Sequence, residues 1–121
     1  MALVAVTPEP LDVQALMAEM TRAGTGDGAV ARFVGLVREQ NQGRRVSFLE
    51  YEAYEPLAVR ALGRILDEAL ESWPATRLGV HHRTGRLQLG EASIIIVAVS
   101  PHRGDAFAAC RYTIERVKQI V

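Results

Sequence analysis

The sequence predicts an α+β fold in one domain that spans residues 1–121. Its 121 residues are enough for a single domain to bury a hydrophobic core. Hydrophobic residues make up 49% of the chain and charged residues 23%, which excludes a disordered polypeptide. Helical apolar stripes and β-branched runs both occur, and no internal repeat, linker or low-complexity segment separates them.

The first third of the chain predicts a strand, a helix and a second strand. Residues 2–6 are typical of a short strand. Pro10 opens a helical pattern that a glycine-rich stretch then ends. The apolar face of that helix holds Leu11, Ala15, Leu16, Ala18 and Met20. Residues 29–38 are apolar and β-branched, as in a buried strand, and Gly35 within them indicates a bulge or a close approach.

The middle of the chain predicts a strand followed by a long helix. After a polar loop at 39–45, apolar and acidic side chains alternate over 46–54, the pattern of a half-buried strand that we expect to pair antiparallel with 29–38. Pro56 begins a helix that Trp73 and Pro74 end. Its apolar stripe holds Leu57, Ala61, Leu62, Ile65, Leu66, Ala69 and Leu70, and its outward face holds Arg60, Arg64, Asp67 and Glu71.

The last third predicts two strands and a helix. Residues 77–83 form a strand, glycines bracket a turn-rich excursion at 85–90, and 92–100 is the clearest strand pattern in the chain. Pro101 ends that strand, and a helix begins beyond Gly104. The apolar stripe of that helix includes Phe107, Cys110, Ile114 and Val117.

Charge and composition exclude several classes of partner. The 14 basic and 14 acidic residues balance, so the chain lacks the basic excess of a general nucleic-acid binder. The longest apolar run, near 94–99, is too short to cross a bilayer, and we expect no membrane partner. The first ten residues contain two prolines and no basic stretch, which supports neither a signal peptide nor a transit peptide. We therefore expect a cytoplasmic protein.

Two residues stand out because each is the single member of its type. Cys110 excludes an intrachain disulfide and a multi-cysteine metal cluster, and its apolar surroundings indicate a buried structural thiol rather than a nucleophile. Thirteen of the 14 basic residues are arginine, and Lys118 is the one lysine. An amine can transfer protons or act as a nucleophile where a guanidinium cannot. Lys118 is therefore either a reactive group or a lysine that occurs by chance in a chain whose other basic residues are all arginine.

Other cations lie at the ends of predicted strands. Residues 101–104 lie where a strand ends and a helix begins, so unpaired backbone N–H groups, the helix dipole and the side chains of His102 and Arg103 suit an anion such as phosphate. A solvated turn is an equal alternative there. Arg38 ends a nearly uncharged strand, from which it can project into a cleft or simply meet solvent.

The remaining polar residues give little indication of a catalytic centre. His81 and His82 are adjacent on a strand and point to opposite faces, so they cannot bind one metal ion together. Glu50 and Glu52 are more typical of a solvated sheet surface than of a catalytic acid pair. The sequence has no glycine-rich phosphate loop, serine nucleophile elbow or Cys–His pair.

Three blocks of this sequence resemble the large, catalytic subunit of molybdopterin synthase. They are GAVARFVGLVRE, LEYEAYEPLAVRAL and HRTGRLQLGEASIIIVAVSPHRGDAFAACRYTIERVK, and the similarity covers about residues 28–118. The pattern HRxGxLxxGE, followed by a strand and xHR, is specific to that family. The resemblance implies an α/β hammerhead-type fold with a mainly antiparallel sheet and about three helices.

The same resemblance implies an activity and a set of partners. The family forms a central homodimer with a small ubiquitin-like sulfur-carrier subunit at each end, a heterotetramer in all. It converts cyclic pyranopterin monophosphate to molybdopterin by installing two sulfurs as a dithiolene, with the carrier's C-terminal thiocarboxylate as the donor. The expected activity is that of a sulfurtransferase in molybdenum cofactor biosynthesis, with no metal or redox cofactor in the subunit itself.

The resemblance also assigns site residues by position. The substrate-contacting and pocket-wall positions are Phe33, Leu36, Val37 and Arg38. His102 and Arg103 match the phosphate-binding pair, and Lys118 matches the catalytic lysine. We expect Arg38 to join His102 and Arg103 in holding the substrate phosphate. Family members continue past this helix with a proline, aromatic residues and a second functional lysine, which the 121 residues do not reach.

Two other function classes compete with a sulfurtransferase. One is a non-catalytic dimeric module that keeps the anion site and binds a phosphorylated ligand or the carrier protein. The other is a purely structural dimer.

Helix geometry adds an expectation about assembly. Lys118 lies fifteen residues beyond Arg103, which within one helix separates them by roughly 20 Å along the axis. One small substrate cannot bridge that distance. If both residues serve one active site, that site is shared across a dimer, with Lys118 of one chain facing His102 and Arg103 of the other.

Overall fold

A computed structural model of the chain describes residues 2–22, 26–38, 40–41, 44–45, 48–51 and 55–120, and it describes side chains only outside 39–54. Its elements are β1 (Ala2–Thr7), α1 (Val13–Thr21), β2 (Ala29–Leu36), β3 (Gln40–Asn41), β4 (Arg44–Arg45), β5 (Phe48–Tyr51), α2 (Glu55–Ser72), β6 (Arg77–Arg83), β7 (Gly85–Gln88), β8 (Ala92–Ser100) and α3 (Arg103–Ile120).

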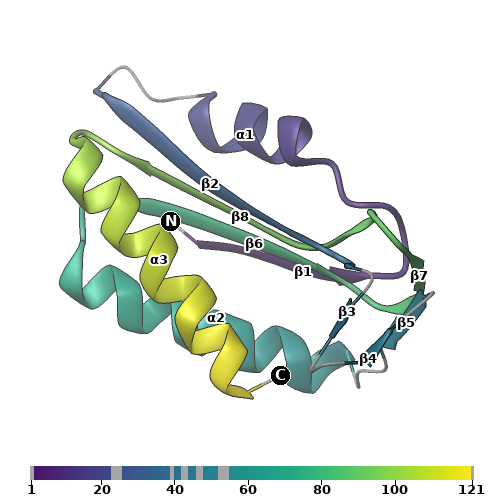
Figure 1. Ribbon diagram of the computed structural model, residues 1–121. Helices are drawn as coiled ribbons and strands as arrows, with labels where there is room; N and C mark the ends of the chain where they lie inside the picture. Colours follow the sequence, from purple (N-terminus) through teal and green to yellow (C-terminus); the bar gives the residue numbers. More distant parts are fainter. Residues whose placement is uncertain are drawn as a thin grey trace.

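Four of the strands form one sheet with the order β1-β6-β8-β2. The β6–β8 and β2–β8 pairs are antiparallel, and only β1 and β6 run parallel. Helix α1 covers one face of this sheet, and α2 and α3 cover the other (Figure 1). The predicted α+β fold with three helices and a mainly antiparallel sheet is confirmed.

The central strand β8 explains the clarity of its sequence pattern. Its residues 94, 96 and 98 face α2 and α3, whereas 95, 97 and 99 face α1, and all six are at most 4% exposed. A strand buried on both faces needs apolar side chains at every position. The continuous run of β-branched residues in β8 is therefore the sequence signature of its central place.

Strand β2 differs from its prediction because it lies at the edge of the sheet. We expected a buried strand, yet its burial alternates, and Val30, Val34 and Leu36 are at least 37% exposed. The prediction for Gly35 is confirmed, because the register shifts between Gly35 and Leu36, and a Cβ at Gly35 would lie 2.7 Å from Cγ2 of Ile94. Gly35 thus allows β2 to approach β8 closely.

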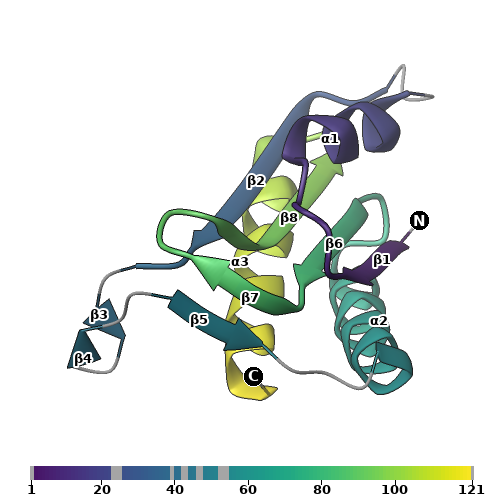
Figure 2. The same cartoon turned by 90° about the vertical axis from the view of Figure 1, so that its right-hand side faces the viewer.

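The predicted pairing of 29–38 with 46–54 is wrong. Strand β2 pairs with β8 along its whole length, and β5 pairs with β7, which occupies part of the excursion predicted as turns at 85–90. Gly85 and Gly90 have φ values of 90° and 84°, so they supply the left-handed backbone that flanks this short strand. Together with β3 and β4, these strands lie beyond one end of the main sheet (Figure 2).

Two smaller corrections concern loops and helix starts. The segment 39–45, predicted as a loop, contains the two-residue strands β3 and β4, which are too short to produce a periodic pattern. Helix α1 begins at Val13 rather than at Pro10, because the Asp12 side chain accepts a hydrogen bond from the Ala15 N–H at 3.0 Å and caps the helix. The predicted strand at 46–54 is described only as β5, and the remaining residues of that range lie outside the described residues.

The helical faces agree with the sequence patterns except at a few positions. In α1, Leu16 and Met20 are buried as expected, whereas Ala15 and Ala18 are exposed. In α2 and α3, Leu57 is 59% and Phe107 is 64% exposed, although both were placed on apolar stripes. Leu57 is the third residue of α2, and Phe107 is the fifth residue of α3 and lines a groove beside β2. Among the described residues, no helix is long and apolar enough to cross a membrane.

Candidate functional site

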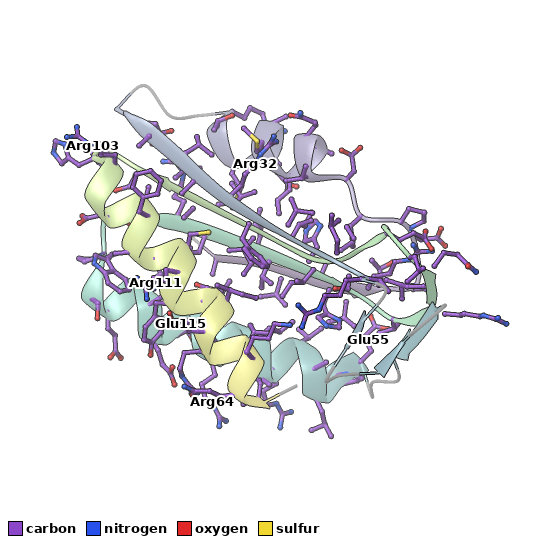
Figure 3. The ribbon with its side chains drawn as sticks, in the orientation of Figure 1. Arg32, Glu55, Arg64, Arg103, Arg111 and Glu115 are labelled. Carbon is purple, nitrogen blue, oxygen red and sulfur yellow. The ribbon has the colours of Figure 1, made fainter. Side chains whose placement is uncertain are left out.

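His102 and Arg103 lie at the start of α3, where the chain leaves the buried end of β8. The Ala106 N–H donates to the His102 carbonyl at 3.3 Å, which closes the first helical turn. Both side chains are exposed, and Arg103 projects from one end of the molecule (Figure 3). They line a hollow of about 440 Å³ together with Gly28, Pro101 and Gly104. A guanidinium and an imidazole beside unpaired helical N–H groups are chemically suited to an anion.

Lys118 lies at the opposite end of the same helix. It is exposed and stands in the last turn of α3, where a cation is stabilised by the helix dipole. His82 lies near it on the sheet, and the pKa of His82 is lowered, chiefly by burial and further by the positive charge of Lys118. His81 points to the other face, where burial lowers its pKa and Glu19 of α1 opposes that shift. The prediction that these histidines face apart is therefore confirmed.

The end of β2 presents Leu36 and Arg38 to solvent around a buried Val37. Leu36 is 58% exposed, Arg38 is exposed, and Val37 is 3% exposed. The Val37 N–H donates to the Glu91 carbonyl at 3.0 Å, and its own carbonyl accepts from the Gly90 N–H at 2.8 Å. Val37 therefore anchors this segment, and its neighbours remain free to contact a ligand.

A groove of about 380 Å³ runs between the edge strand β2 and α3. It is lined by Val30, Ala31, Arg32, Phe33, Phe107, Cys110, Arg111 and Ile114. Phe33, which the resemblance assigns to a pocket wall, lies in the wall of this groove. Cys110 is 7% exposed, so the prediction of a buried thiol is confirmed, and burial raises its pKa to about 11.

The candidate residues fall into two groups at opposite ends of α3. Strand β2 begins beside Ser100 and ends beside Ala92, so Leu36 to Arg38 lie at the end of the sheet away from His102 and Arg103. Ile114 lines the groove near the middle of β2, and Lys118 lies one turn further toward the end of that strand. Within one chain, Arg38 is therefore not brought together with His102 and Arg103, and roughly 20 Å of helix separates Arg103 from Lys118.

The sequence patterns did not identify one residue that lines the hollow at His102 and Arg103, and they predicted no metal site. Gly28 belongs to the glycine-rich stretch predicted to end the first helix, and nothing in the sequence indicates that it borders the hollow. A glycine directly before a strand does not indicate which residues it contacts. The hydrogen-bond partner of Gly28 is Ser100 of β8, which is distant in the sequence. Glu50 and Glu52 lie outside the residues whose side chains are described, and no group of three His, Cys, Asp or Glu that could hold a metal occurs among the residues that were described.

Comparison with known proteins gives a consistent result. The profile of the family described as "MoaE protein" matches residues 6–120. The molybdopterin synthase catalytic subunit of Halalkalibacterium halodurans is 38% identical over 117 residues, which are 97% of this chain and 74% of that protein. The protein of the same description from Bacillus subtilis is 41% identical over 116 residues, 96% of this chain and 73% of its own length.

A solved structure agrees with the sequence matches. The crystal structure of molybdopterin synthase from Staphylococcus aureus superposes with a TM-score of 0.88 at 40% identity. The match covers 97% of this chain and 84% of that one.

Proposed function

The chain belongs to the MoaE protein family, and from that membership we propose that it is a sulfurtransferase, the catalytic subunit of a molybdopterin synthase. It would act in molybdenum cofactor biosynthesis, as its relatives' names indicate. In this proposal a small ubiquitin-like carrier subunit donates sulfur from its C-terminal thiocarboxylate, and cyclic pyranopterin monophosphate accepts it to form the dithiolene. The observation that carries the proposal is the placement of exposed basic side chains at both ends of α3. His102 and Arg103 lie at its start, and Lys118 lies in its last turn.

His102 and Arg103 are assigned to the substrate phosphate. A phosphate carries the fixed negative charge of the substrate, and the start of α3 offers helical N–H groups, a guanidinium and an imidazole around one hollow. A guanidinium can bind two phosphate oxygens at once, which fixes orientation as well as affinity.

Lys118 is assigned to the sulfur-transfer step. Its amine can serve as an acid, a base or a transient nucleophile near the thiocarboxylate, which no arginine of this chain can do. The pKa of His82 is lowered chiefly by burial, and His82 lies near enough for the charge of Lys118 to add to that lowering. Leu36 and Arg38, held outward by the buried Val37, lie at the same end and are assigned to substrate contact.

These assignments require two copies of the chain. The phosphate-binding pair and the lysine of one chain lie roughly 20 Å apart along α3, too far for one small substrate. A two-fold homodimer places Lys118 and Arg38 of one chain beside His102 and Arg103 of its partner, and it does so twice. With a carrier subunit at each outer end, the assembly is a heterotetramer.

The reconstituted reaction tests this proposal. The full chain is mixed with thiocarboxylated carrier and cyclic pyranopterin monophosphate, and dithiolene product is measured. Formation of product above the level of carrier and substrate alone is the expected result. Tight binding of substrate or carrier without product would instead identify a non-catalytic binding module.

A further inference from the structure

Gly28 lies against the turn that carries His102 and Arg103. Its N–H donates to the Ser100 carbonyl at 3.1 Å, and the next residue, Ala29, is paired with Ser100 in the sheet. The start of β2 and the end of β8 lie side by side at the end of the molecule where α3 begins (Figure 1). Gly28 is therefore the last point of contact between β2 and the residues that lead into the turn.

The space at Gly28 is too small for any side chain. A Cβ there would lie 2.2 Å from the Pro101 carbonyl oxygen and 3.3 Å from its carbonyl carbon. These are backbone atoms, so the contact cannot be relieved by turning a flexible side chain. By contrast, a Cβ at Gly26 or at Gly104 would meet nothing within 4 Å. Of these three glycines only Gly28 is closely packed, and the two on either side of the contact are open.

The Pro101 carbonyl belongs to the peptide that joins Pro101 to His102. Moving that oxygen rotates the peptide plane and shifts the N–H of His102, because the peptide unit is rigid. Arg103 follows directly and begins α3. A displacement at Pro101 therefore reaches both residues assigned to phosphate.

The β2 side of the contact is anchored more firmly than the turn. Asp27 forms an ion pair with Arg77 of β6, and both side chains are less than 30% exposed. Arg77 also donates from Nε to the Met20 carbonyl at 3.1 Å, and in the sheet it is paired with Val99. Residues 101–104 are all exposed. A clash between Gly28 and Pro101 would therefore move the turn rather than the start of β2.

We infer that Gly28 is a positioning residue for phosphate recognition: the absence of a side chain on its α-carbon sets where residues 101–104 lie, and so where His102 and Arg103 meet the anion. The inference rests on the proposed function. It adds a residue that borders the hollow but takes no part in the proposed chemical step. It also assigns a role to Asp27 and Arg77, which hold Gly28 in place.

Gly28→Ala tests the inference, with Gly26→Ala as the matched control. Binding of inorganic phosphate to the full chain is followed by the amide chemical shifts of His102 and Arg103, and dithiolene formation is measured with substrate and carrier. Gly28→Ala should raise both the Kd for phosphate and the KM for substrate by at least about tenfold, with kcat changed less, because a displacement of about 1 Å is costly at an oriented site. Gly26→Ala should match the unchanged chain.

A double variant separates positioning from general damage. If Gly28 acts only through the turn, adding Gly28→Ala to Arg103→Ala should weaken phosphate binding by much less than Gly28→Ala does in the unchanged chain, because the displaced turn then misplaces only His102 and coupled residues are not additive. Additive losses would overturn the inference, as would phosphate binding by Gly28→Ala equal to that of the unchanged chain, or no phosphate binding by the unchanged chain. A chain that makes no dithiolene but shows the phosphate pattern would overturn the proposed function and leave this inference standing.

Asp27→Asn keeps the test available if Gly28→Ala does not fold. This variant retains the side-chain shape but loses the ion pair with Arg77, which loosens the anchor without crowding Pro101. It should weaken phosphate binding by about threefold, a smaller effect than direct displacement, while the melting curve remains cooperative. Unchanged phosphate affinity in a folded Asp27→Asn variant would contradict the role of the anchor.

Discussion

Lys118 and Arg103 are both exposed cations on α3, yet the proposed chemistry asks different things of them. Arg103 needs only a permanent charge and several donors, which a guanidinium provides. Lys118 needs to exchange a proton or form a transient bond, which a guanidinium does not do. Substitutions that preserve charge therefore distinguish the two roles better than substitutions to alanine.

Lys118→Arg should preserve substrate binding and lose turnover. Proton transfer by a positioned group contributes about a hundredfold or more to rate, so we expect kcat to fall by at least that factor. Steady-state dithiolene formation gives kcat, and calorimetry gives the substrate affinity. Activity near that of the unchanged chain would make Lys118 an incidental charge.

Arg103→Ala should weaken substrate binding by tens of fold. A charge-assisted hydrogen bond contributes about 1.5–3 kcal/mol, and phosphate is the fixed anion of the substrate. Calorimetric titration with the cyclic pyranopterin measures the change directly. Unchanged substrate affinity together with weaker carrier binding would assign Arg103 to the protein interface instead.

Cys110 should be unreactive in the folded chain below about pH 9. Burial raises its pKa to about 11 from 9.0, so the folded state keeps its proton where the unfolded state releases it. Its contribution to stability is therefore fully present below pH 9.0 and is lost as pH rises through about 11. Reaction with a chromogenic disulfide, with and without denaturant, checks the first point, and denaturation curves for this chain and for Cys110→Ala check the second. Rapid labelling of the native thiol at neutral pH would contradict the assignment.

Among the elements, helices α1 and α3 have different roles on opposite faces of the sheet. Helix α1 covers the face of the sheet that α2 and α3 leave open, and its buried Leu16 and Met20 pack against Ile95, Val97 and Val99 of β8. A Cβ at Gly79 of β6 would lie 3.1 Å from Leu16, so the helix packs tightly on the sheet. Helix α3, on the opposite face, carries the proposed chemistry.

Leu16→Ala should lower the free energy of unfolding by about 3 kcal/mol, because the side chain is 1% exposed and its removal leaves a cavity. Phosphate binding at 20 °C should not change if the variant remains folded, since α1 lies on the far face from α3 (Figure 1). Urea denaturation measures the first effect, with Ala18→Ser at an exposed position of α1 as the control. A loss below about 1 kcal/mol would contradict the packing.

Elements whose burial is uniform were predictable from the sequence, and those that depend on distant partners were not. Strand β8 is buried on both faces and α2 has one broad apolar stripe, so each carries its own pattern. Strand β2 was predicted as buried and paired with 46–54, because a sequence does not say that a strand lies at an edge. The start of α1 was misplaced because the Asp12 cap outweighed Pro10.

The site was predictable to a similar extent. The cationic residues at both ends of α3 are visible in the sequence, because His102 and Arg103 follow a strand-ending proline and Lys118 is the single lysine. Their separation along α3 follows from helix geometry. The role of Gly28 was invisible, since it depends on the Pro101 carbonyl, which lies 73 positions further along the chain.

For the whole molecule, the proposed assignments make catalysis a property of a dimer. One chain holds the pair proposed to bind phosphate and the proposed reactive amine at opposite ends of a single helix, so in this proposal a monomer has two incomplete half-sites. Two-fold symmetry completes both sites at once, because each chain supplies the half that the other lacks. Either half-site can therefore be disabled in a separate chain and the two chains combined.

Mixed dimers test this central claim most directly. Chains with Lys118→Ala and chains with Arg103→Ala are unfolded together, refolded, and assayed for dithiolene formation with carrier and substrate, against each homodimer alone. One of the two sites in a mixed dimer keeps both unchanged groups, so an equal mixture should recover about a quarter of the unmodified activity. No recovery in dimers demonstrated to be mixed would contradict a site shared between chains.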